Sequence, residues 1–267
     1  MTRRGWFAVL LAAALAVAFA FLALPMVAIF VDTSPGALLD SLGNGESLDA
    51  LRLSLECSAL ALALIVIVGT PAAYLLATRS FRGRALVITV LELPLVLPPA
   101  VAGIALLAAL GPKGILGSAL ADAGVELVLT TAGVVVALTF VASPFSLRQA
   151  QAAFAAVDPT LVAAARTLGA GEARAFASVA IPLARGGLAA GAALAWGRAL
   201  GEFGATLMFA GSLRGVTQTA PLAIYDRFAT DFPAALALSA VLLCVSAAVL
   251  LAVRLAAGPE ALGRARA

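Results

Sequence analysis

The sequence contains no histidine and only two cysteines among its 267 residues. Cys57 and Cys244 are far apart and lie in or beside apolar stretches, so neither a disulfide framework nor a zinc site is indicated. The single lysine, Lys113, stands in a Gly-Pro-Lys-Gly tetrapeptide that lacks the glycine spacing and the following Ser or Thr of a phosphate-binding loop. A Gly-x-Ser-x-Gly nucleophile motif is also missing. These absences predict no metal, no cofactor and no enzymatic activity.

Charged residues are scarce as well. They make up 12% of the chain, against 63% hydrophobic residues and a mean hydropathy of +1.09. An ordinary soluble domain carries about 25% charged residues, so the composition predicts an integral membrane protein. Six apolar stretches are long enough to cross a bilayer as helices: residues 7–31, 54–78, 85–110, 127–147, 183–210 and 234–253. We therefore expect an all-α, polytopic membrane protein with about six transmembrane helices, in which residues 1–267 form a single transmembrane domain.

The basic residues divide unequally between the two sides of these spans. Of the 17, Arg198 lies deep within a span and four lie in loops on one side; the remaining twelve lie in loops or at span ends on the other side, together with both termini. The four are Arg52, Lys113, Arg214 and Arg227. Because cytoplasmic loops carry the excess of Lys and Arg, both termini are predicted to be cytoplasmic. The pI near 9.4 then reflects topology and gives no reason to expect a nucleic-acid partner.

The segment over residues 148–182 lies between two spans and carries its own helix signals. Asp158 suits an N-cap, Pro159 the first helical position and Gly169 the position just past the end. A short helix is therefore predicted over residues 159–168. It is either a plain connector or a helix that another protein binds outside the membrane, and the residues favour neither interpretation.

Three charged residues are expected at membrane depth, where each costs about 2.5–3.5 kcal/mol. They are Glu92, Arg198 and Glu202. Arg198 and Glu202 are four residues apart, so they can pair on one helix face. Such a pair either holds helices together or lines a polar pathway, with Glu92 as a candidate neighbour.

Prolines interrupt the third expected span at Pro94, Pro98 and Pro99. Broken backbone at membrane depth is tolerated where it is buried in protein or lines a water-filled cavity. Residues 93–103 are therefore a candidate for a translocation path, and a plain kink is the competing interpretation.

The cytoplasmic segment resembles the loop signature of ABC importer permeases. It has a pair of alanines, a glycine after three further residues, and Val-Ala-Ile-Pro after nine more. In that family the loop forms a coupling helix that docks in a groove of a separate ATPase subunit. The usual glutamate of the signature is replaced by Ala163. The resemblance implies a coupling role for Asp158, Pro159, Ala164, Ala165, Gly169 and Pro182.

Three other segments are similar to the molybdate branch of that family. They read ELPLVLPP over residues 92–99, RALGEFGAT over 198–206 and TQTAPLAIY over 217–225. The resemblance covers about residues 54–253, and sulfate and tungstate permeases share parts of it. It implies the type I ABC importer permease fold.

The resemblance also implies partners and a mechanism. Two copies of the chain would form the path in the cell inner membrane, an ATPase dimer would sit under the coupling helices, and an extracytoplasmic binding protein would deliver a tetrahedral oxyanion, molybdate before tungstate or sulfate. ATP binding would turn the path outward and hydrolysis would reset it. The alternative from another class is an ion-coupled secondary transporter, which would use Glu92 and Glu202 directly.

Overall fold

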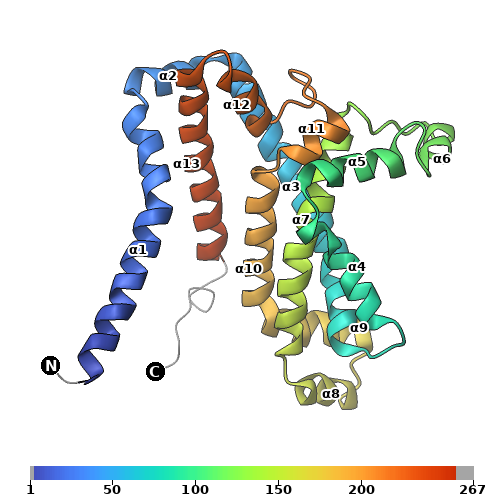
Figure 1. The fold of residues 1–267 in the computed structure, drawn as a ribbon. Helices are drawn as coiled ribbons and strands as arrows, with labels where there is room; N and C mark the ends of the chain where they lie inside the picture. The colour runs from blue at the N-terminus through green and yellow to red at the C-terminus, as the bar shows by residue number, and fades with distance from the viewer. Residues whose placement is uncertain (1–2, 257–267) are drawn as a thin grey trace.

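The computed structural model describes residues 3–256, and this part of the chain contains thirteen α-helices, one π-helical turn and no strand (Figure 1). Five helical stretches within it are long and apolar enough to cross a membrane. They are α1 (Arg3–Asp32), α3 (Gly45–Thr78), α7 (Thr131–Ala155), a continuous stretch over Glu172–Leu200 and α13 (Phe232–Ala256). The prediction of an all-α membrane protein with about six transmembrane helices is confirmed, with a difference in the third span.

That third span, expected as one helix over residues 85–110, is divided into α4 (Arg84–Val96) and α5 (Pro99–Leu110). Pro98 and Pro99 cause the division, because proline has no N–H and disfavours helical backbone at the residue before it. Leu97 accordingly has φ −69° and ψ 131°. Pro94 stays inside α4. The chain turns between the two helices, so that α5 leaves α4 at a steep angle (Figure 1).

The fifth expected span, over residues 183–210, starts earlier and is divided near its end. It begins with α9 (Glu172–Ala175), passes through the π-helical turn η1 (Phe176–Ala180) and continues as α10 (Ile181–Leu200). Three residues then separate it from α11 (Gly204–Ala210). Pro182 lies in the first turn of α10, where the chain changes from π to α hydrogen bonding and the missing N–H is accommodated.

Helices α3, α7 and α10 form the centre of the bundle. Their shared core consists mainly of small and branched apolar side chains, among them Cys57, Ala61, Ile65, Val134, Leu138, Ala142, Ala195 and Ala199. Small side chains allow membrane helices to approach closely and gain packing contacts. One polar contact joins α3 and α10, where the indole N–H of Trp196 donates to Ser58 Oγ at 2.9 Å.

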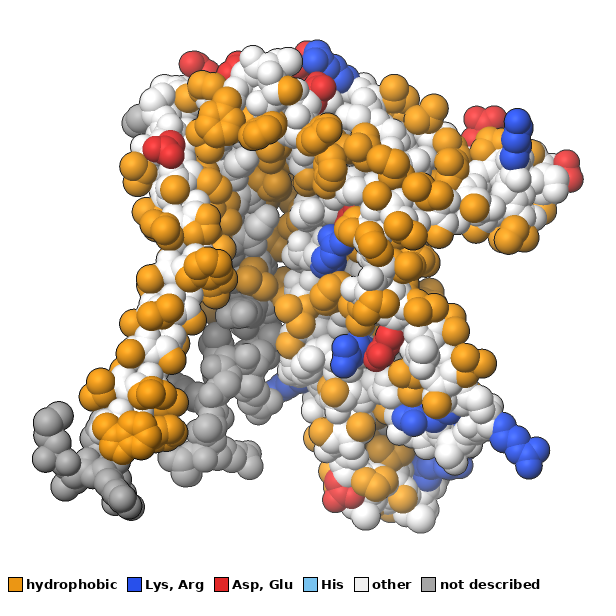
Figure 2. Space-filling model, viewed as in Figure 1, with side chains coloured by type: hydrophobic (Ala, Val, Ile, Leu, Met, Phe, Trp, Pro, Cys, Tyr) orange, Lys and Arg blue, Asp and Glu red, His pale blue; other side chains and the backbone are white. Residues whose placement is uncertain are grey.

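Short helices lie at the two ends of the bundle (Figure 1). At one end are α2 (Pro35–Gly43), α6 (Gly117–Asp122) and α12 (Ala220–Phe228), and at the other is α8 (Pro159–Thr167). Charged side chains gather at these two ends, and hydrophobic side chains cover the helices between them, with a few charges at mid-height (Figure 2). This distribution is that of a protein that crosses a bilayer.

Gly187 offers a test of the packing between α7 and α10. A Cβ atom at Gly187 would overlap the Cβ of Ala153, whereas one at the adjacent Gly186 would meet nothing within 4 Å. Gly187→Leu should force the helices apart and cost about 1–3 kcal/mol, which lowers the melting temperature of the purified protein in detergent. Gly186→Leu should leave that temperature near its original value. Equal losses in both variants would contradict the close contact.

Candidate functional site

The break between α10 and α11 is built around one buried carboxylate. Glu202 is 1% exposed. Its Oε1 accepts a hydrogen bond from the backbone N–H of Ala205 at 2.7 Å, in the first turn of α11. Its Oε2 lies 2.6 Å from Nη2 of Arg198, whose side chain is 27% exposed. The predicted pair of Arg198 and Glu202 is therefore present, and Glu202 also serves as an acceptor for a helix start.

The break between α4 and α5 is in contact with the break between α10 and α11. A Cβ atom on Gly204 would lie 2.8 Å from Cβ of Pro99, and one on Gly103 would lie 2.6 Å from the carbonyl oxygen of Ala205. The backbones of α5 and α11 are thus in direct contact, and only glycine fits at these two positions. Pro98 and Pro99, at the N-cap and first position of α5, set the point where this contact begins.

Glu92, a candidate neighbour of Arg198 and Glu202, forms its ion pair with another residue. Its Oε1 is 3.1 Å from Nε of Arg148, so its ion pair joins α4 to α7. Arg148, expected at the start of the cytoplasmic segment, lies within α7, which continues to Ala155. The loop between the membrane helices is correspondingly shorter than 148–182. Both side chains of the pair remain accessible, with 63% of Arg148 and 37% of Glu92 exposed.

The short helix α8 has the ends that the sequence predicts. Asp158 Oδ1 accepts hydrogen bonds from the hydroxyl of Thr160 at 2.7 Å and from its backbone N–H at 2.9 Å. These bonds, the hydroxyl bond first, lower the pKa of the Asp158 carboxyl below its usual value. A carboxyl whose pKa is lower in the folded chain than in the unfolded chain stabilises the fold at any pH above the unfolded pKa. The cap therefore contributes fully at neutral pH, and its contribution is lost as the pH falls through the folded pKa. Gly169 ends the helix with φ +91°.

Helix α8 presents an apolar stripe to the outside. Leu161 and the C-cap residue Leu168 are 48% and 88% exposed, and Ala164, between them on the same face, is exposed too. On the inner side, Val162 and Ala165 are half-buried. Leu161, Ala164 and Leu168 are three and four positions apart, so they form one apolar stripe.

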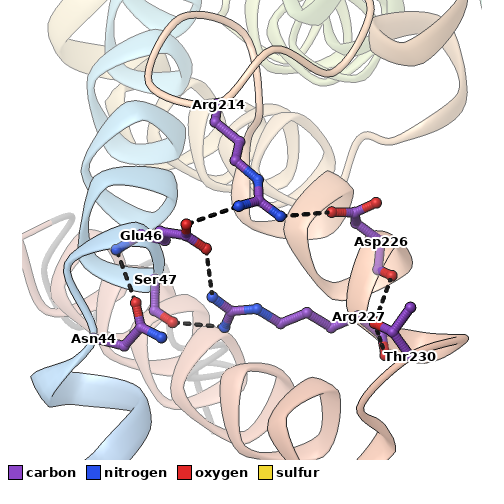
Figure 3. Close-up of polar contacts among 7 residues, drawn as sticks. All are labelled: Asn44, Glu46, Ser47, Arg214, Asp226, Arg227 and Thr230. Carbon is purple, nitrogen blue, oxygen red and sulfur yellow. Dashed lines mark hydrogen bonds and ion pairs between the residues drawn. The ribbon is translucent and has the colours of Figure 1, made fainter.

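A group of polar contacts at the opposite end was not foreseen from the sequence (Figure 3). Arg214, in the loop before α12, lies 2.8 Å from Glu46 and 3.7 Å from Asp226. Arg227 of α12 donates to Ser47 Oγ at 2.6 Å and lies 3.7 Å from Glu46. The first turn of α3 is therefore tied to α12 and to the loop that follows α11. The only sequence signal was that these charges were expected on one side of the membrane.

A helical bundle of membrane length, with two broken helices in contact at its centre, defines a multi-pass membrane protein. Residues 69–258 match the family described as binding-protein-dependent transport system inner membrane components, and the chain belongs to that family.

Relatives and solved structures agree with this assignment. The chain is 41% identical over 233 residues to the molybdenum transport system permease protein ModB of Mycobacterium tuberculosis, covering 87% of this chain and 88% of that one. It is 41% identical over 182 residues to ModB of Escherichia coli, covering 68% and 80%. A bacterial alginate ABC transporter, solved with an alginate-bound periplasmic protein, superposes with a TM-score of 0.76 at 16% identity over 97% and 96% of the chains. The fold is therefore that of a type I ABC importer permease.

The buried pair can be tested by a double-mutant cycle. Glu202→Gln keeps an acceptor for the Ala205 N–H but leaves the Arg198 charge without its partner, which should cost about 3–5 kcal/mol. Adding Arg198→Met removes that uncompensated charge, so the double variant should regain most of the lost stability. The measurement is the melting temperature in detergent. Additive losses would contradict a direct ion pair.

Proposed function

We propose that this chain is the permease subunit of an ATP-driven importer for a tetrahedral oxyanion, and that the anion is molybdate. The observation that carries the proposal is the 41% identity to a molybdenum transport permease over 87% of the chain. The buried Arg198–Glu202 pair and the two broken helices agree with it, because a membrane protein retains intramembrane charge and irregular backbone where they serve a pathway.

The proposed path passes the contact between α5 and α11. Arg198 supplies a guanidinium at this depth that is 27% exposed, while Glu202 holds it in place from the buried side. The α5 N-terminus, set by Pro98 and Pro99, adds the positive end of a helix dipole. Glu92 and Pro94, in α4, would line the same path nearer the cytoplasm. An anion crossing here meets positive charge that the protein has already positioned.

The proposed ATPase partner is a pair of separate subunits that bind α8. The exposed stripe of Leu161, Ala164 and Leu168 would be the contact surface. Asp158 and Pro159 fix where the helix begins, and Gly169 fixes where it ends. Ala165, half-buried, and Pro182, at the start of α10, would hold the helix against the membrane bundle. ATP binding and hydrolysis then act on the path through this helix.

A second copy of the chain and a binding protein complete the proposed importer. Helix α1 packs against α13, and none of its most apolar window is buried in the described part of the chain, which leaves it for lipid and for a second copy. In the proposed orientation both termini are cytoplasmic. The start of α1 and the end of α13 point toward the end that carries α8, which supports placing them on the same side of the membrane as α8 (Figure 1). The binding protein would dock at the opposite end, over α12.

Uptake of molybdate tests the substrate. Cells that lack their own molybdate importer should accumulate radiolabelled molybdate when they carry this chain with its ATPase and binding protein. Tungstate should block the uptake and excess sulfate should not. Uptake of sulfate in place of molybdate would move the assignment to the sulfate branch. Uptake that persists without the ATPase would favour an ion-coupled transporter.

The apolar stripe of α8 gives a test of the ATPase contact. Leu168→Asp puts a charge where an apolar contact is proposed, so binding of the ATPase subunits should weaken and uptake should fall at least tenfold, equivalent to about 1.4 kcal/mol. Leu168→Met keeps the surface apolar and should leave both unchanged. Copurification of the ATPase with the permease is the measurement. Full ATPase recovery with Leu168→Asp would contradict the proposed surface.

A further inference from the structure

Glu172 joins three elements at the cytoplasmic end. It is the first residue of α9, and its Oε1 lies 2.7 Å from Nη2 of Arg79 and 3.4 Å from Nη2 of Arg166. Arg79 is the C-cap of α3, and Arg166 lies in the last turn of α8. One carboxylate therefore links the short cytoplasmic helix to the end of a central membrane helix.

The other contacts of α8 with the bundle are few. All nine of its residues are exposed or half-buried in the described part of the chain. Val162 makes the apolar contact, against the cluster that contains the rings of Tyr74, Phe154 and Phe176. Beside it a pocket of about 310 Å³ separates α8 from the ends of α3 and α7. The Glu172 bridge spans this gap.

Glu172 is the carboxylate that faces the two arginines of this pocket. Ala163 lines the pocket together with Arg79, Arg166 and Glu172. Position 163 therefore brings no carboxylate to the two guanidinium groups, and Glu172, nine residues further along the chain, brings it instead. Without Glu172, two positive charges would face one another across the pocket with no partner among its lining residues in the described structure.

A hydrogen bond also connects the end of α3 to α4, the first half of the broken third span. Nε of Arg84, the first residue of α4, donates to the carbonyl oxygen of Leu76 at 2.8 Å. Helix α4 is then tied to α7 by the Glu92–Arg148 pair and leads directly to the break at Leu97. A displacement of α8 can thus reach the contact of α5 with α11 through the corner between α3 and α4.

We propose that Glu172 is a positioning residue that transmits movement of α8 to this corner. The proposal rests on the proposed function, since it needs an ATPase that moves α8. The three side chains are 54–61% exposed, and ion pairs this exposed contribute little to the stability of a subunit. Removing the carboxylate should therefore leave the fold intact and change the coupling between ATP hydrolysis and transport.

The test compares Glu172→Gln with the unchanged protein in proteoliposomes that contain the full importer with its ATPase and binding protein. Molybdate uptake and ATP hydrolysis are measured in the same preparation. The ratio of molybdate taken up to ATP hydrolysed should fall about threefold or more in Glu172→Gln, while the melting temperature stays unchanged. Arg79→Gln should lower the ratio similarly, and the double variant should be no worse than either single one, because both remove the same link.

A matched control comes from the other end of α3. Arg52 and Glu56 form an ion pair of the same length, 2.7 Å, that is also exposed and lies far from α8. Glu56→Gln should leave the ratio unchanged.

Three results would overturn the proposal. They are an unchanged ratio in Glu172→Gln, additive losses in the Arg79 and Glu172 cycle, and a ratio that falls only together with the melting temperature. Oxyanion uptake by the importer without any substitution tests the proposed function separately. If this importer takes up no oxyanion, the proposed function fails and this proposal fails with it.

Discussion

The fold depends on one buried ion pair at a place where two helices are broken. A break at membrane depth exposes backbone groups that lipid cannot satisfy. Glu202 resolves this for α11 by accepting the Ala205 N–H, and its own charge is balanced by Arg198 one turn back in α10. Glu202 thus accepts from the first turn of α11 and pairs with a guanidinium of α10. In the same place α11 rests against α5 through Gly103 and Gly204.

The ion pairs of this protein fall into two physical kinds. In the Arg198–Glu202 pair Glu202 is buried and Arg198 is 27% exposed, so breaking the pair leaves a largely desolvated charge without its partner and is costly. The Glu92–Arg148 and Arg79–Glu172 pairs are exposed, so each can open and close at little cost. A costly contact beside the helix breaks, with exposed links toward α8, suits the proposed transporter, in which movement of α8 has to reach the path.

Local signals in the sequence predicted much of this arrangement. The N-cap at Asp158 and the stop at Gly169 act on their own neighbours, so α8 followed from them. The prolines at 98 and 99 marked an interruption of the third span but did not decide between a kink and a full break. Contacts between distant segments did not follow. Glu92 pairs with Arg148 because α7 extends to Ala155, and hydropathy alone gives helix ends only to within several residues. The bridge from Glu46 to Arg214 and Arg227 depends in the same way on how three separate segments pack.

The central claim, that the break after α10 lines a water-filled path, is tested most directly by thiol accessibility at position 201. Gly201 is exposed, and a side chain there would approach only the carbonyl oxygen of Gly197, at 3.7 Å. The variant Gly201→Cys is made in a chain whose own thiols are removed by Cys57→Ala and Cys244→Ala. We predict that a membrane-impermeant, charged thiol reagent labels position 201 in the assembled importer and that ATP changes the labelling rate. Labelling by lipid-soluble reagents alone, indifferent to ATP, would contradict the account.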